Sequence, residues 1–319
     1  MKAILFLLLL IVFSLFSCKD DDVTINFVYP VSSLVIDNSN NLWVGSDAGL
    51  FKIATGYEKI DIKNNSPVTA LGIDLSGNTL WIGTSTGLSY LSLSGPPFIV
   101  DPIPLENLSD PFVNSIFTDS GSVNWFGTGI GITRNSGLEW QTGKFKKNAN
   151  GTITSASFES TSINSIACWD GDYYFATNGQ SMYRAFNWNP TVDAFSGASQ
   201  LTNPYNGPAL TDTMYVVFVD SQGRQWMGGR NGLQVHSGHD SKTGLTFYNE
   251  ELSNLIIHCI AEAPDGKIWV GTENGISVFD GSNWTTLSST LPDVFVTAIA
   301  FEPNGRAWIG TKKGLVHIN

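Results

Sequence analysis

A short motif, an aromatic residue followed by any residue, Gly and Thr, recurs along almost the whole chain. Seven copies begin at Trp43, Trp81, Trp125, Tyr174, Trp226, Trp269 and Trp308, although the fourth reads Tyr-Phe-Ala-Thr and a few others vary at the last position. Successive copies are 38, 44, 49, 52, 43 and 39 residues apart, and in most a second Gly with Leu or Ile follows. A unit this short cannot bury its own apolar surface, so its copies must stack on one another.

Each repeat contains four segments that read as short strands. Continuous apolar runs such as 68–74, 113–119 and 294–301 predict an innermost strand A, and a turn such as 74–78 or 220–224 follows. The repeated motif is strand B, the run after the second Gly is strand C, and a looser segment is strand D. Four strands at this period predict an all-β, seven-bladed β-propeller with four antiparallel strands per blade.

The first residues resemble an export signal. Lys2 precedes an apolar run over 3–16, which is shorter than the roughly 20 residues of a membrane-spanning helix. The run ends at 15–18, Leu-Phe-Ser-Cys, which resembles the lipobox of bacterial lipoproteins and implies a lipid on Cys18; an ordinary signal peptide is the alternative. The acidic stretch at 19–22 reads as a tether and resembles a surface-export signal. We therefore expect a signal peptide at 1–17, a tether at 18–22 and the propeller at 23–319, in an outer-membrane lipoprotein that faces either the periplasm or the cell surface.

The charge of the mature chain limits its partners. Loss of Lys2 reduces the 17 basic residues to 16 against 28 acidic ones, a formal net charge of −12. Such a chain is a poor ligand for nucleic acid, and we expect it to meet the membrane only through the lipid on Cys18. Cys168 and Cys259 fall in blades that are not neighbours, which predicts two free thiols.

The repeat resembles that of the two-component-regulator propeller family, in which an apolar strand leads into Asp-x-x-Gly-x-x-Trp-x-Gly-Thr and then Gly-Leu. The resemblance spans 30–319 and implies a periplasmic or extracellular β-propeller. The family is best known as the ligand-sensing half of hybrid sensor kinases. No kinase sequence is present here, so the resemblance does not carry over the signalling role.

Residues that could carry catalysis are scattered. The recurrent acids at 37, 74, 119, 170 and 220 occupy one turn of each repeat, so we interpret them as turn residues rather than a shared site. They also resemble the Asp-box of sialidases, but the five Arg residues do not cluster as a carboxylate-binding site requires. The spacing of His236, His239 and Asp240 is the one metal-like pattern, and we expect it in a surface loop between strands C and D of blade 5. No catalytic residue, metal or cofactor is predicted.

Candidate binding residues come from two sources. The longest repeats carry extra stretches at 144–162 and 187–212, which we interpret as loops on a binding face that present Trp188 and Tyr205. The turns between strands B and C differ in sequence from blade to blade, although the strands on either side of them repeat. A single asymmetric ligand would require such different side chains at equivalent positions. The candidates in these turns are Asp47, Thr86, Asn178, Arg230, Asn231, Glu273 and Lys312.

Three functions remain open. The first is a monomeric binding lipoprotein that holds a glycan or a partner protein at one mouth of the ring. The second is a metal-dependent lyase or hydrolase, resembling the streptogramin-inactivating lyases, and it would need His258 at the channel with a carboxylate nearby. The third is a structural subunit of an outer-membrane assembly.

The two ends of the chain predict how the ring closes. The seventh repeat ends after strand C, whereas 24–29 alternates apolar and mostly polar residues at period two before the first repeat begins. We expect 24–29 to form the outer strand of blade 7, antiparallel to strand C at 314–318.

Overall fold

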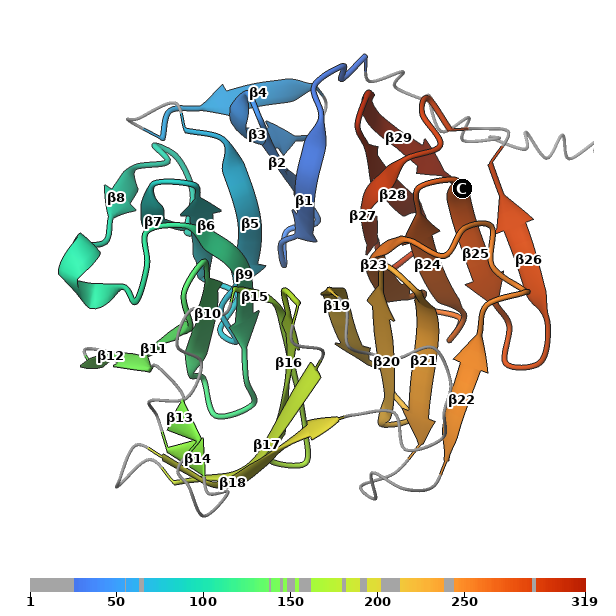
Figure 1. Ribbon diagram of the computed structural model, residues 1–319. Helices are drawn as coiled ribbons and strands as arrows, with labels where there is room; N and C mark the ends of the chain where they lie inside the picture. Colours follow the sequence, from blue (N-terminus) through green and yellow to red (C-terminus); the bar gives the residue numbers. More distant parts are fainter. Residues whose placement is uncertain are drawn as a thin grey trace, which may run out of the picture.

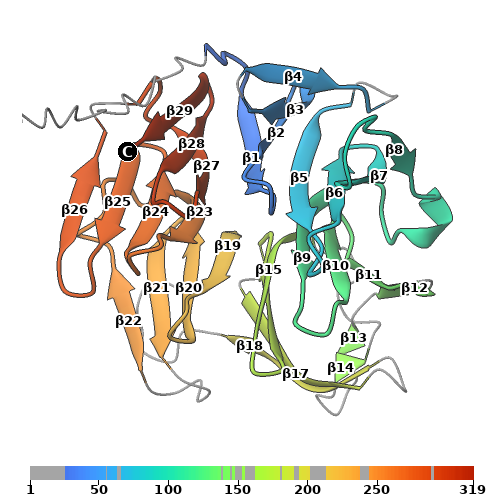
Figure 2. The same ribbon diagram turned by 180° about the vertical axis from the view of Figure 1, so that it is seen from behind.

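The computed structural model describes residues 26–54, 56–62, 66–137, 139–143, 146–147, 153–154, 162–179, 182–189, 194–201, 213–237, 244–288 and 291–319. In this part of the chain, seven antiparallel sheets stand around a common axis as the blades of a ring (Figures 1 and 2). The prediction of an all-β, seven-bladed β-propeller is confirmed. No helix of the described residues is long and apolar enough to cross a membrane.

The first three blades follow one another along the chain. Blade 1 comprises β1 (Val31–Ile36), β2 (Leu42–Ser46), β3 (Gly49–Ile53) and β4 (Tyr57–Ile60). Blade 2 comprises β5 (Val68–Ile73), β6 (Thr79–Thr84), β7 (Gly87–Ser92) and β8 (Val100–Pro102), and the 3-10 turn η1 (Leu105–Asn107) follows it. Blade 3 comprises β9 (Val113–Thr118), β10 (Asn124–Thr128), β11 (Ile132–Ser136) and β12 (Glu139–Gly143).

A small ribbon of β13 (Lys146–Lys147) and β14 (Ile153–Thr154) separates blade 3 from the rest. Blade 4 comprises β15 (Ile163–Trp169), β16 (Asp172–Thr177), β17 (Met182–Asn189) and β18 (Ala194–Leu201). Blade 5 comprises β19 (Met214–Val219), β20 (Arg224–Gly229), β21 (Gly232–Ser237) and β22 (Leu245–Tyr248). Blade 6 comprises β23 (Ile257–Glu262), β24 (Ile268–Thr272), β25 (Gly275–Phe279) and β26 (Trp284–Leu287). Blade 7 contains β27 (Val296–Phe301), β28 (Ala307–Thr311) and β29 (Gly314–Ile318).

Every blade is a meander in which sequential strands pair. Because the strands alternate in direction, the turns between strands B and C lie at the same end of the ring as the connections from one blade to the next. We call this the B–C end. The turns between strands A and B and between strands C and D lie at the opposite end, which we call the A–B end.

The Gly of each repeat lets neighbouring blades approach closely. A Cβ atom added to Gly83 would lie 2.8 Å from Val113 Cγ1, and one added to Gly228 would lie 2.5 Å from Ile257 Cγ2. In both pairs the second residue is the first residue of strand A in the next blade. Any side chain at these glycines would therefore push two blades apart.

The repeated aromatic residues are core residues, as predicted. Trp43, Trp125 and Trp226 are fully buried, and in each the indole N–H donates to an Asp carboxylate six residues earlier at 2.8–2.9 Å. The same three Asp residues also accept backbone N–H groups of their own turns, and so does Asp74, although it accepts from no indole. The turn interpretation is thus confirmed for Asp37, Asp74, Asp119 and Asp220. In blades 1, 3 and 5 the carboxylate thus joins the hairpin to the buried indole.

The N-terminal segment reaches the predicted edge of blade 7. The backbone N–H of Leu315 donates to the carbonyl oxygen of Phe27 at 3.2 Å, so this segment runs beside β29. The predicted strand is not formed over its described part, because residues 26–30 are not in a strand and the described sheet of blade 7 has three strands. Blade 7 is instead joined to blade 1 by side-chain packing, in a cluster that includes Phe27, Val31 and Trp308.

Two further predictions were wrong about local structure. The stretch that begins at 187 is not a loop at its start, because Trp188 lies in β17 and pairs with Phe195 of β18. His236 is not in a surface loop either; it lies in β21, is 6% exposed, and its Nδ1 is 2.8 Å from Gln225 Oε1. His239 and Asp240 lie outside the described residues. The prediction of free thiols at Cys168 and Cys259 is confirmed.

Candidate functional site

A β-bulge at the start of every strand A aims one side chain at the next blade. The register shifts between the first and third residues of each strand, so the second residue is the extra one. In five blades this residue is small and polar and bonds to the following blade. The donors are Ser32, Thr69, Asn114, Asn164 and Thr297.

Blades 5 and 6 depart from this pattern. The second residue of β19 is Tyr215 and that of β23 is His258, and their rings stack at 5.2 Å with an angle of 24° between planes. His258 stacks in turn on Phe295, at 4.7 Å and 28°, from the connection that leads into blade 7. Three aromatic rings from three successive blades thus form one row at the B–C end.

Charged side chains border this row. Nε2 of His258 is 3.2 Å from Oε1 of Glu273, which lies in the B–C turn of blade 6. The ammonium group of Lys312, in the B–C turn of blade 7, lies 3.5 Å from the centre of the Phe295 ring, a cation–π contact. We call these five residues, Tyr215, His258, Glu273, Phe295 and Lys312, the mouth cluster.

The surroundings of His258 in the mouth cluster favour the neutral form of its imidazole. Burial lowers the pKa of His258 below its ordinary value of 6.5, Glu273 opposes this shift, and the positive charge of Lys312 adds to it. The side chain remains 22% exposed, so a ligand can reach it. A neutral imidazole next to a carboxylate can accept a proton or donate a hydrogen bond.

Most of the candidates in the B–C turns lie at the same end as the mouth cluster. Glu273 and Lys312 belong to the cluster, whereas Asp47, Arg230 and Asn231 are exposed on their turns. The other two bond to neighbouring segments. The hydroxyl of Thr86 is 2.8 Å from that of Ser66, and Asn178 Oδ1 accepts a hydrogen bond from Thr213 at 2.8 Å.

The remaining candidates are not brought to this place. The backbone of Trp188 lies late in strand C of blade 4, toward the A–B end of the ring. Tyr205 and Cys18, the predicted site of the lipid, lie outside the described residues, and so does most of the stretch at 144–162.

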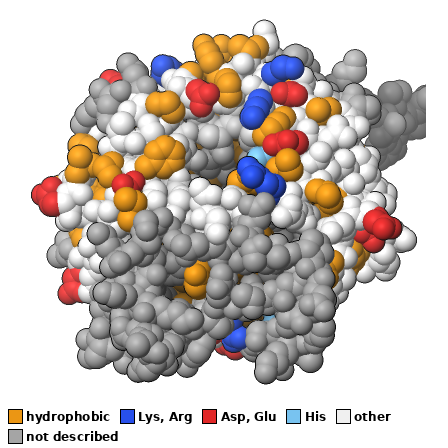
Figure 3. All heavy atoms as spheres, viewed as in Figure 1, with side chains coloured by type: hydrophobic (Ala, Val, Ile, Leu, Met, Phe, Trp, Pro, Cys, Tyr) orange, Lys and Arg blue, Asp and Glu red, His pale blue; other side chains and the backbone are white. Residues whose placement is uncertain are grey.

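Figure 3 shows one end of the ring, where histidine, basic and acidic side chains gather beside a central hollow. Among the described residues no group of three or more His, Cys, Asp or Glu side chains is placed to hold a metal ion. What the mouth cluster offers is a stack of three aromatic rings, one of them an imidazole, with one cation and one anion beside it. Such a surface suits a ligand with an apolar face and polar substituents.

Sequence reasoning did not select Tyr215 and Phe295. Alignment of the seven strands A would have identified Tyr215, because the equivalent residue in most blades is Ser, Thr or Asn. Phe295 precedes β27 and has no such signal.

These features define a seven-bladed β-propeller built from Trp-Gly repeats. Residues 251–274, which include strands A and B of blade 6, match the two component regulator propeller family. The chain therefore carries this repeat, as the sequence pattern implied. No curated protein matches the chain in sequence.

Solved structures share the fold over nearly the whole chain. The extracellular domain of the hybrid two component system BT3049 from B. thetaiotaomicron superposes with a TM-score of 0.72 and 19% identity, over 93% of this chain and 40% of that one. A streptogramin B lyase gives 0.66 and 16%, over 93% and 95%. YCF48 bound to D1 peptide gives 0.63 and 15%, over 92% of both chains. At these identities the likeness concerns the fold.

Proposed function

We propose that this chain is an extracytoplasmic binding protein that holds a glycan or a partner protein at the B–C end of its ring. The observation that carries the proposal is the mouth cluster. At the position where the other blades use a small residue to bond to their neighbour, two successive blades carry Tyr215 and His258. The packing of the blades, which is the same around the ring, does not require large rings at this position in two blades only. Binding of an asymmetric ligand on one side of the ring would require them.

The surroundings of the mouth cluster support a ligand of considerable size. Large apolar side chains at the same end are 39–43% exposed; they are Phe112, Ile130, Leu255 and Val294. Exposed apolar residues around a polar centre are typical of a surface that binds a partner or an extended ligand.

The start of the sequence supports an extracytoplasmic location, with the lipid on Cys18 as the link to the outer membrane. A fatty-acid probe fed to cells should label the wild type and leave Cys18→Ala unlabelled. Equal labelling of both proteins would remove the anchor from the proposal, and the binding site would be unaffected.

The binding experiment uses two neighbouring lysines. Lys312 contacts Phe295 in the mouth cluster, whereas Lys313 is exposed in the same turn and serves as the matched control. A panel of plant and host oligosaccharides is tested by thermal shift, and an outer-membrane extract is tested by cross-linking and pull-down. We expect a ligand that Lys312→Ala and Tyr215→Thr both weaken and Lys313→Ala does not. Binding that all three variants leave unchanged would contradict the proposal.

A second candidate is an elimination or hydrolysis reaction at the same place. It is favoured by the His258–Glu273 pair, because a partly exposed imidazole whose pKa is lowered and which a carboxylate orients can serve as a general base. Incubation with quinupristin, followed by chromatography with and without a chelator, tests it. Conversion by the wild type that is lost in His258→Asn would establish it, and an unchanged substrate would leave binding as the function.

A further inference from the structure

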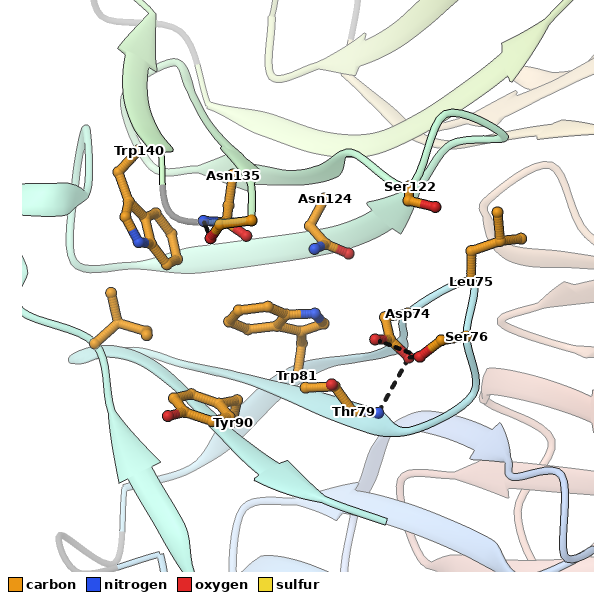
Figure 4. A pocket seen from close by; sticks show the side chains of 12 residues that line it. Asp74, Leu75, Ser76, Thr79, Trp81, Tyr90, Ser122, Asn124, Asn135 and Trp140 are labelled. Atoms are coloured by element: carbon orange, nitrogen blue, oxygen red, sulfur yellow. Dashed lines mark hydrogen bonds between the residues drawn. The ribbon is translucent and has the colours of Figure 1, made fainter. Parts of the chain in front are cut away.

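A cavity of about 450 Å³ lies between blades 2 and 3, at the A–B end and thus away from the mouth cluster (Figure 4). The A–B turns of both blades contribute to it, as do strands of both sheets. Its apolar walls include Trp81 and Tyr90 of blade 2 and Trp140 of blade 3, and its polar lining includes Asp74, Asn124 and Asn135.

The indole N–H of Trp81 has no hydrogen-bond partner in the described part of the chain, although Trp81 is only 7% exposed. The cause is visible in the sequence: Asp74 stands seven residues before Trp81, whereas the bonded pairs in blades 1, 3 and 5 are six apart. The longer hairpin leaves Asp74 bonded to Ser76 and to its own turn, with Oδ1 accepting from Thr79 N at 3.0 Å. Figure 4 shows the Trp81 nitrogen facing the side of the cavity where Asp74 and Asn124 lie.

Across the cavity stands a buried pair of amides. Asn124 of β10 and Asn135 of β11 are cross-strand partners, 6% and 3% exposed. Asn124 Oδ1 accepts from Thr118 at 2.7 Å and Asn135 Nδ2 donates to Gly137 O at 2.9 Å. The other polar atom of each amide makes no hydrogen bond to a described residue. One donor and one acceptor on the lining of the cavity therefore have no partner among the described residues.

Other blades show that this pair is unusual. At the same register, blades 1, 2, 6 and 7 have two apolar residues, such as Leu80 and Leu91 in blade 2. Blade 5 has Gln225 and His236, and these two bond to each other at 2.8 Å. Buried polar groups are normally bonded, and each one left without a partner destabilises the fold. The Trp81 N–H is such a buried group, and the amides of Asn124 and Asn135 line the same cavity with one polar atom each that is bonded to no described residue. A ligand in the cavity would complete all three.

We propose that this cavity binds a small uncharged ring compound, of one or two rings, with an apolar face and a polar edge that carries both a hydrogen-bond acceptor and a donor. The rings of Trp81, Tyr90 and Trp140 receive the face, and the Trp81 N–H and the two amides receive the edge. The carboxylate of Asp74 at one end disfavours anions. An aromatic lactam and a sugar ring share this chemistry.

The decisive variant replaces both amides with the residues of blade 2, giving Asn124→Leu with Asn135→Leu. Because it removes the unpaired groups and copies a leucine pair that a neighbouring blade already accommodates, its melting temperature should equal or exceed that of the wild type. A markedly lower melting temperature would show that the amides serve folding, and would overturn the proposal.

Binding is measured by calorimetry with uracil and methyl glucoside as the two uncharged rings and benzoate as an anion of similar size. We expect saturable binding of at least one uncharged ring to the wild type, its loss in the double leucine variant, and a loss of about tenfold in affinity in Trp81→Phe, which keeps a ring but lacks the N–H. Lys312→Ala should bind as the wild type does. No binding of either ring, equal binding of benzoate, or unchanged binding in the double variant would overturn the proposal.

Discussion

Asp119 should contribute far more to stability than Asp74, although both occupy the same turn of neighbouring blades. Asp119 is 5% exposed, and its Oδ2 accepts from the indole of Trp125 at 2.9 Å and from the hydroxyl of Tyr173, in the next blade, at 2.6 Å. Asp74 is partly exposed and accepts only from groups of its own turn. Replacing each residue with Ala therefore compares the stability lost with a carboxylate that links two blades and the stability lost with one that bonds only within its turn.

The loss of unfolding free energy in each variant can be estimated from these contacts. Asp119→Ala removes the carboxylate that accepts from two buried donors, at about 1–3 kcal/mol for each lost bond, so the free energy of unfolding should fall by about 4 kcal/mol. Asp74→Ala removes bonds that water can replace and should cost about 1 kcal/mol. Asp119→Asn keeps one acceptor oxygen and should lie between the two. A fall of about 4 kcal/mol is a large part of the stability of a typical domain.

Urea-induced unfolding, followed by tryptophan fluorescence and by circular dichroism, measures these differences. Coincident transitions in the two signals are required, since the free energies assume a two-state process. Equal unfolding midpoints for Asp119→Ala and Asp74→Ala would refute the reasoning, because the loss of the two buried bonds would then cost nothing.

Three other outcomes follow from contacts described above. Because the pKa of His258 is lowered in the folded state, the unfolded chain binds a proton at this residue more readily. The contribution of His258 to stability is therefore fully present above pH 6.5 and is lost as the pH falls below it. Melting curves should show that the melting temperature falls less on acidification in His258→Asn than in the wild type. Gly83→Ala should cost about 1–3 kcal/mol because its methyl group meets Val113, whereas Gly56→Ala, with nothing within 4 Å, should cost about zero; equal denaturation curves would contradict this. Phe27→Ala should cost about 3–5 kcal/mol, since its 3% exposed ring packs between blades 1 and 7, and a change below 1 kcal/mol would show that this contact does not hold the ring together.

The fold could be predicted from the sequence because its constraints repeat. The Gly after each Trp must face the next blade, and the Asp before it must reach the indole, so both are found at fixed spacing in most repeats. A single repeat would have been ambiguous. Seven in succession leave one architecture that buries them all.

The errors arose where one contact outweighed a local pattern. The alternation over 24–29 predicted a strand, but Phe27 turns into the cluster between blades 1 and 7, and Pro30 ends the segment without an N–H to donate. The long repeat of blade 4 was interpreted as a loop, whereas its extra residues lengthen β17 and β18. The length of a repeat shows that it contains extra residues. Only the pairing of its strands shows that some of them extend β17 and β18.

Only part of the candidate site could be predicted from the sequence. Turn positions identified Glu273 and Lys312, but a turn position does not show which blades bring their side chains together. Asn124 and Asn135 of blade 3 face each other because of the register of β10 with β11, and this register could not be predicted from the sequence.

The way in which the ring closes has a mechanical consequence. The chain enters the ring at the junction of blades 7 and 1. There the backbone N–H of Leu315 bonds the N-terminal segment to β29, and the ring of Phe27 packs on Phe51 of blade 1. A pull on the N-terminus would load these contacts first and then the packing of β1 against β27. If the proposed lipid on Cys18 holds the chain to a membrane, force along the N-terminus would open the ring between blades 7 and 1. A ligand that bridges blades 5 to 7 would not reinforce this junction.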